Sequence, residues 1–251
     1  MLVAQDQVRP PTSAASAAGG TVDAGAAQRQ RSLARAARHE ILRRLAPALR
    51  HDMVVPLQSM GMMAEAVNAR LERGVYAPDE MQAAVSKLNR LSRQAVQHCL
   101  HVVSWIEGAE DDTVPLPEGV DECVTLLRSS LGFRGFNLRS EAGDSVLDVG
   151  RGAIRFLLSA AILTLTDSAT APGDVVITAE TSSTHAVLQV LHSPVEGEPL
   201  LHECTELPIA WTEVQALAAE EAVDIRHHGT SVVMRLPRSM VTAPLKMVPV
   251  V

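Results

Sequence analysis

The chain has 251 residues, 47% hydrophobic but only 2% aromatic, so aliphatic side chains must fill its core. Its formal net charge of -7 argues against a general nucleic-acid-binding protein, which usually carries a basic surplus. The three cysteines, Cys99, Cys123 and Cys204, form no CxxC pair, which indicates neither a zinc knuckle nor a disulfide framework. We recognise no signal peptide, and the longest apolar stretch is too short to span a bilayer, so we expect a cytoplasmic protein without membrane contact.

The first segment, residues 1–34, is rich in Ala, Ser, Gly, Gln and Pro and has no apolar period. This composition predicts a disordered tail. The arginines at its end, from Arg29 to Arg38, are typical of the solvated start of a helix.

Residues 35–108 show two apolar seams with alternating spacings of three and four, one from Leu42 to Leu71 and one from Met81 to Ile106. Gly74 and Pro78 lie between them and predict a tight connection, so the two helices must pack as an antiparallel hairpin. Each helix leaves a second apolar edge open. We therefore expect two copies of the chain to complete a four-helix bundle as a homodimer.

The remainder of the chain is mixed. Residues 109–118 are acidic, contain Pro115 and Pro117, and predict a linker, whereas residues 119–238 predict an α/β domain and residues 239–251 a C-terminal tail. In this domain we expect helices over 120–131, 152–169 and 209–222, and strands over 136–141, 145–149, 175–180, 186–192, 223–227 and 231–236, with a turn at 228–229. The predicted fold class is α+β, a helical hairpin followed by helices on one face of a mixed sheet.

The most informative segment is His51-Asp52-Met-Val-Val-Pro56-Leu57, which interrupts an otherwise apolar helix. A neutral imidazole is nucleophilic near pH 7 and can accept a phosphoryl group, and a neighbouring carboxylate can bind the other ring N–H. Pro56 lacks the N–H that would bond the Asp52 carbonyl, which predicts a kink beneath the histidine. Taken alone, these residues also fit a surface His–Asp pair on a kinked helix.

This segment resembles the H-box of the histidine kinase superfamily, in which His, an acidic residue, three further residues and Pro-Leu lie on the first bundle helix. The resemblance implies that His51 is the phosphoacceptor and Asp52 its acid/base neighbour. Many family members with phosphatase activity place Thr or Asn four residues after the histidine. Val55 stands there in this chain, which argues against hydrolysis of a partner's phosphoaspartate.

The resemblance also implies a Bergerat-type ATP-binding domain over the C-terminal part, but its motifs are degenerate. The helical positions expected to hold asparagine for Mg²⁺ are Ser159 and Leu163, and Leu163 cannot bind a metal. The adenine-reading motif is replaced by a segment that starts at His192, and the segment from Glu206 to Trp211 contains no glycine to cradle phosphates. We therefore expect no intrinsic cofactor and no ATP binding.

An acceptor histidine without an ATP site is typical of the dimeric histidine phosphotransferases derived from kinases. The resemblance then implies receiver domains of response regulators or of a hybrid kinase as partners, with Mg²⁺ bound by the receiver. The alternative functions are a catalytically silent adaptor or inhibitor that binds a response regulator or kinase and, disfavoured by Val55, a response-regulator phosphatase.

Several residues around His51 are candidates for the docking face. The hairpin geometry predicts that His98 and His101, on the second helix, lie opposite His51 on one rim. Histidines at this spacing also fit a metal site with a third ligand, but polar docking residues need no metal. The candidate docking residues are Arg50, Val54, Val55, Gln58, His98 and His101.

Overall fold

The structure, a computed structural model, describes residues 17–74, 77–107, 112–144, 147–195, 197, 200 and 206–239, with side chains of the first helix described from residue 24. Two long helices come first, α1 (Ala17–Glu72) and α2 (Pro78–Glu107). The C-terminal domain follows in the order β1 (Thr113–Pro115), α3 (Leu116–Phe133), β2 (Phe136–Glu141), β3 (Asp148–Gly150), α4 (Arg151–Asp167), β4 (Gly173–Thr181), β5 (His185–Pro194), α5 (Trp211–Glu220), β6 (Asp224–His228) and β7 (Ser231–Pro237).

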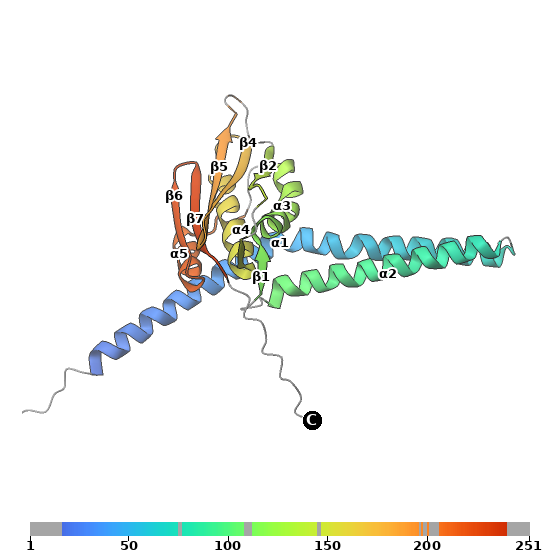
Figure 1. Cartoon of the computed structure of the whole chain (residues 1–251), viewed down its shortest axis with the longest axis horizontal. Helices are drawn as coiled ribbons and strands as arrows, with labels where there is room; N and C mark the ends of the chain where they lie inside the picture. The colour runs from blue at the N-terminus through green and yellow to red at the C-terminus, as the bar shows by residue number, and fades with distance from the viewer. Residues whose placement is uncertain are drawn as a thin grey trace, which may run out of the picture.

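The predicted hairpin is present. The second half of α1 and all of α2 run side by side away from the C-terminal domain (Figure 1). At the end of α1, Gly74 adopts a φ of +64°, a left-handed conformation that favours glycine, and its N–H donates to the Leu71 carbonyl. Pro78 then starts α2, where a missing backbone N–H costs nothing.

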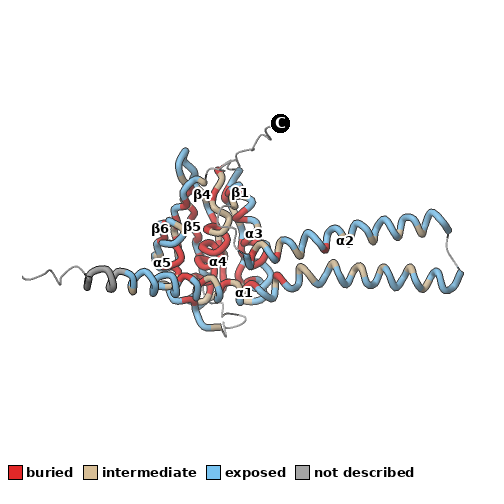
Figure 2. The backbone as a smooth tube through the Cα atoms, turned by 90° about the horizontal axis from the view of Figure 1, so that it is seen from below, coloured by how far each residue is buried: buried red, intermediate tan, exposed pale blue. Residues whose placement is uncertain are grey.

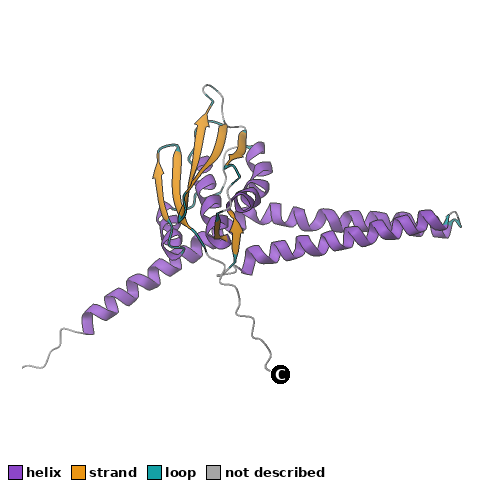
Figure 3. Ribbon diagram, in the orientation of Figure 1, coloured by secondary structure: helices purple, strands orange, loops and turns teal. Residues whose placement is uncertain are grey.

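The C-terminal domain confirms the predicted α+β class. Its main sheet has the strand order β2-β4-β5-β7-β6, in which β2 and β4 are parallel and the other neighbours antiparallel. Helices cover one face of this sheet (Figure 3). Alternate residues of β5, such as Leu188 and Val190, are fully buried under them, whereas Gln189 is exposed on the open face.

The N-terminal prediction is wrong for the described residues 17–34, which are helical. Ala has the highest helix propensity, and Ala34 and Ala37 are fully buried, because small side chains let α1 lie close beneath the C-terminal domain. Figure 2 shows that the buried residues of α1 are confined to the part of the helix that passes beneath the C-terminal domain. The buried row is Ala34, Ala37, Ile41, Leu45 and Leu49.

The linker prediction for 109–118 is also wrong for its described part. Residues 113–115 form β1, paired antiparallel with β3, and Leu116 begins α3 with Pro117 in the first turn. Val114 and Leu116 are fully buried, so this segment belongs to the domain core. The prolines therefore start a helix instead of marking a loop.

The other predicted elements match within a few residues, although Ser145 lies outside the described residues and the strand expected there begins at Asp148. Of the predicted C-terminal tail, only Ser239 is described. Among the helices in the described part of the chain, none combines the length and apolarity needed to cross a membrane.

Candidate functional site

His51 lies on α1 two residues after Leu49, the last α1 side chain buried beneath the C-terminal domain. Its side chain is 73% exposed, and its Nδ1 lies 3.5 Å from Oδ1 of Asp52, whose side chain is 34% exposed. The helix continues through Pro47 and Pro56. Figure 1 shows α1 changing direction where it passes the domain, but the kink at Pro56 stays a prediction.

Asp52 opens onto a cleft of about 740 Å³ between the hairpin and α3. His98 and His101 line the same cleft, so the structure brings them together with Asp52, whose carboxylate contacts His51. The wall opposite the hairpin is acidic and comes from α3. Its lining residues there are Glu118, Asp121, Glu122, Thr125 and Leu126.

His101 is held from behind by Trp105. The Trp105 Nε1–H donates to Nε2 of His101 at 3.2 Å, and the rings meet edge to face. Burial lowers the pKa of His101, the charge of Arg155 lowers it further, and Glu122 and Asp52 act in the opposite sense. A hydrogen bond accepted at Nε2 assigns the ring proton of the neutral imidazole to Nδ1.

Trp105 is itself fixed by the C-terminal domain. It is fully buried, its ring packs edge to face on Phe156, and the guanidinium of Arg155 lies 4.6 Å from its centroid. Arg155, only 4% exposed, also donates to Glu122 at 2.7 Å and to the Ser104 carbonyl at 3.1 Å. The end of α2 is therefore joined to α3 and α4.

The remaining docking candidates are on the surface of the hairpin. Arg50 and Gln58 are exposed, and Val54 and Val55 are 39% and 43% exposed. No group of three or more His, Cys, Asp or Glu residues in the described part of the chain has the geometry to hold a metal ion. Cys99 and Cys123 are free thiols, and Cys204 lies outside the described residues.

The positions at which the resemblance would place ligands for Mg²⁺ and ATP lie in the core or beside a small cavity. Ser159 and Leu163 are 0% and 3% exposed within the core face of α4. His192, at the end of β5, lines a cavity of about 130 Å³ with residues from the end of α4 and the β6–β7 turn. Ligand pockets usually measure roughly 300–1,000 Å³. Burial lowers the pKa of His192, and its buried Nε2 has no hydrogen-bond partner among the described residues.

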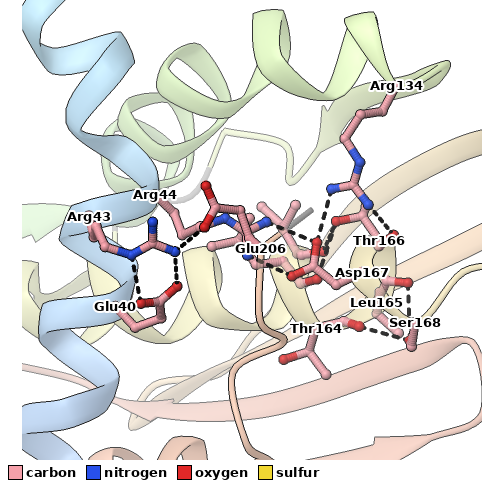
Figure 4. A network of polar contacts seen from close by, with 12 residues as sticks. Glu40, Arg43, Arg44, Arg134, Thr164, Leu165, Thr166, Asp167, Ser168 and Glu206 are labelled. Atoms are coloured by element: carbon pink, nitrogen blue, oxygen red, sulfur yellow. Dashed lines mark hydrogen bonds and ion pairs between the residues drawn. The ribbon is translucent and has the colours of Figure 1, made fainter. Parts of the chain in front are cut away.

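The segment that precedes α5 is held on α1. Arg43 forms ion pairs with Glu40, at 2.6 Å, and with Glu206 (Figure 4). The hydrogen bonds from Arg43 lower the pKa of both carboxyls. Glu206 begins the stretch in which the resemblance would place a phosphate-covering loop, and this contact holds it against a helix.

A buried ion-pair cluster also fastens α1 to the domain. The Asp167 side chain is completely buried, and its two oxygens each accept a 2.9 Å hydrogen bond from Arg44 of α1. Arg134 donates to Asp167 at 2.9 Å and to the Thr166 carbonyl at 2.6 Å (Figure 4). Nearer the N-terminus of α1, the two Nη atoms of Arg38 form ion pairs with the carboxylates of Glu220 and Glu221 at the end of α5, at 2.8 and 2.7 Å.

Sequence reasoning missed most of the cleft. Its α3 wall carries no motif, and a surplus of acids on the exposed face of one amphipathic helix was the available signal. It also missed that Trp105 donates to His101, although their spacing of four residues places the two side chains on one helix face.

No protein-family model matches the chain, and no curated protein matches it. Solved structures with similar folds include the Acinetobacter baumannii histidine kinase AdeS, with 14% identity, a TM-score of 0.39, and coverage of 76% of this chain and 98% of that one. A histidine kinase from Burkholderia phymatum has 11% identity, a TM-score of 0.41 and coverages of 80% and 97%. A structure described as a bacterial phosphotransferase has 15% identity, a TM-score of 0.33 and coverages of 78% and 95%.

Proposed function

We propose that the protein is a histidine phosphotransferase of two-component signalling, which accepts a phosphoryl group on His51 from a receiver aspartate and passes it to another receiver. The observation that carries this proposal is an imidazole with 73% exposure on a helix, paired with a carboxylate and set beside a large cleft. A core histidine would be buried, and a purely structural surface pair would need no such cleft.

The chemistry follows from the His51–Asp52 contact. With its ring proton on Nδ1 beside Asp52, His51 has its lone pair on Nε2. The Nε2–P bond forms as the bond between phosphorus and the receiver's carboxylate oxygen breaks, and that electron pair leaves with the carboxylate. The ring keeps its Nδ1–H and becomes positively charged, and Asp52 stabilises that charge. Return to a second receiver's aspartate is the same step reversed, and the Mg²⁺ it requires belongs to the receiver.

We further propose that the chain does not use ATP. Burial of Ser159 and Leu163, the small cavity at His192 and the attachment of Glu206 to α1 support this part of the proposal. Each corresponds to one of three separate requirements of a nucleotide site, namely metal ligands, base recognition and a phosphate-covering loop.

Two copies of the chain are proposed to pair through the hairpin. Val85, Val96 and Val103 of α2 are 46%, 53% and 41% exposed, and their intervals of eleven and seven residues place them on one line along the helix. Leu100 and Ile106 flank this line. We call these five residues the α2 apolar edge. A four-helix bundle buries such an edge.

The test is transfer from a receiver domain that carries labelled phosphate on its aspartate. We expect the label to move to the wild type and to His39→Ala, a control that removes another exposed histidine of α1, but not to His51→Ala. The label on the wild type should be lost in acid and stable in alkali. Loss of receiver label without labelled protein would indicate a phosphatase. A stable complex without either change would replace the proposal with an adaptor.

A further inference from the structure

A second large groove lies where α1 and the end of α2 meet the C-terminal domain. It has a volume of about 710 Å³, and the described residues that line it include none of those that line the cleft beside His51. Its apolar lining residues are Leu42, Ile106, Ala153 and Phe156. Ile106 is 65% exposed, so the described part of the chain leaves apolar surface uncovered in this groove. We call it the α2–α4 groove.

The last described residue lies at the rim of the α2–α4 groove. After β7, the N–H of Ser239 donates to the Asp148 carbonyl at 2.9 Å. Gly150, at the other end of the short strand β3, lines the groove, and a Cβ placed on Gly150 would lie 3.7 Å from Oγ of Ser239. The chain that follows Ser239 therefore starts beside the groove.

The sequence of that chain suits the groove. Residues 240–251, which we call the tail segment, lie outside the described residues. All of them except Thr242 and Lys246 are apolar or proline, and the two prolines favour an extended conformation. The segment carries no acidic side chain. Its one basic residue, Lys246, complements Glu107, an exposed acid of the groove that has no ion pair within the described part of the chain.

We propose that the tail segment binds in the α2–α4 groove of its own chain as an extended strap, which covers Ile106 and brings Lys246 to Glu107. Attachment at the rim gives the segment an effective concentration in the millimolar range, so a separate polypeptide has to compete with it. Ile106 and Glu107 belong to the end of α2, whereas Phe156 belongs to α4. The strap thus joins the base of the hairpin to the C-terminal domain. This inference is independent of the role proposed for His51.

Disulfide trapping in the full chain tests where the segment binds. Gly152→Cys places a thiol in the groove, at a position where a Cβ meets no atom within 4 Å, and Ala243→Cys places one in the segment. The control combines Ala243→Cys with Arg235→Cys on the exposed face of β7, because Arg235 and Ala243 each lie four residues from Ser239. A disulfide needs a Cα–Cα distance of about 4.4–6.8 Å. Peptide mass mapping should find at least about ten times more disulfide in the groove pair than in the control pair.

Two outcomes of this experiment would overturn the inference. One is an equal yield of disulfide in the two pairs, which would show that the segment has no preference for the groove. The other is a disulfide that forms only between copies, which a mixture of ¹⁵N-labelled and unlabelled chains would reveal. That result would assign the groove to the segment of a second copy.

Trypsin cleavage after Lys246 tests occupancy of the groove without introduced thiols. Gly152→Phe fills part of the groove, and residues 247–251 should then be released about tenfold faster than from the wild type, because proteolysis follows the population of the unbound segment. Gly132→Phe is the matched control, since Gly132 is also a helical glycine with open space but lies outside the groove. Circular dichroism checks that both variants are folded. Equal release from all three proteins would refute the strap and leave the proposed phosphotransfer intact.

Discussion

The two halves of α1 have opposite surroundings although they form one helix. The row from Ala34 to Leu49 is almost completely covered by the C-terminal domain, whereas Val54, Leu57 and Met62 of the hairpin half are 39%, 48% and 65% exposed. Ion pairs follow the same division, since Arg38, Arg43 and Arg44 all bind acids of the C-terminal domain. The first half of α1 makes its apolar contacts and ion pairs within one chain, whereas the second half leaves apolar side chains exposed to which a partner can bind.

The strongest test of this difference removes the buried carboxylate that fastens the first half. Asp167→Ala removes the buried carboxylate that Arg44 and Arg134 share, and we expect a loss of about 3–5 kcal/mol in the free energy of unfolding. Urea unfolding followed by circular dichroism measures it. The matched control is Asp174→Ala, because Asp174 also forms an ion pair with an arginine, Arg139, but on the surface. A surface ion pair contributes about 0–1 kcal/mol to the free energy of unfolding. Equal losses would show that the cluster is not buried in solution.

A pair of leucines on α1 compares the two halves directly. Leu45→Ala, at 1% exposure, should cost about 2–5 kcal/mol of folding stability at any protein concentration. Leu57→Ala should cost less, and its cost should diminish when the protein is diluted enough to dissociate the proposed dimer. Urea titrations at two protein concentrations separate these outcomes. A loss at Leu57 that does not depend on protein concentration would indicate that this part of α1 does not contact a second copy.

The third prediction concerns the α2 apolar edge. Val96→Lys places a charge in the proposed bundle interface twice, once from each copy, and should weaken dimerisation by at least about a hundredfold. Light scattering coupled to size-exclusion chromatography reports the molecular mass. Gln94→Lys is the control, since Gln94 is exposed on the opposite face of α2. A Val96→Lys protein that remains dimeric would exclude this edge from the interface.

The smallest expected effect is a pH dependence of the stability of the C-terminal domain. Burial lowers the pKa of His192 below its ordinary value of 6.5, so the unfolded chain binds a proton more readily than the folded one. Above that ordinary pKa the histidine is neutral in both the folded and the unfolded chain, so it adds no pH dependence to the stability. As the pH drops below it, the stability should fall. Thermal unfolding midpoints between about pH 7 and 5 should decline less in His192→Phe than in the wild type. Parallel declines would show that His192 is hydrated in the folded state.

Local patterns predicted the elements well, but contacts between distant parts of the chain were harder. The hairpin, most strands and the His51–Asp52 pair follow from spacing and residue type, which a sequence states directly. The helical start of α1 was missed because an alanine-rich segment resembles a low-complexity tail in sequence, and only the fold shows that the C-terminal domain covers some of these alanines. The α3 wall of the cleft and the Arg44–Asp167 pair join residues far apart in sequence, and no short motif marks either.

Because α1 is one continuous helix, the number of residues between Leu49 and His51 determines where His51 lies relative to the C-terminal domain. Leu49 fixes the rotation of the helix, and His51 follows two residues later, about 200° around the axis and 3 Å along it. One residue inserted between them would rotate His51 and Asp52 together by about 100° relative to the C-terminal domain, while the α1 contacts of residues up to Leu49 stayed the same. The packing of α1 against the C-terminal domain therefore sets both the direction of His51 around the helix axis and its position along that axis.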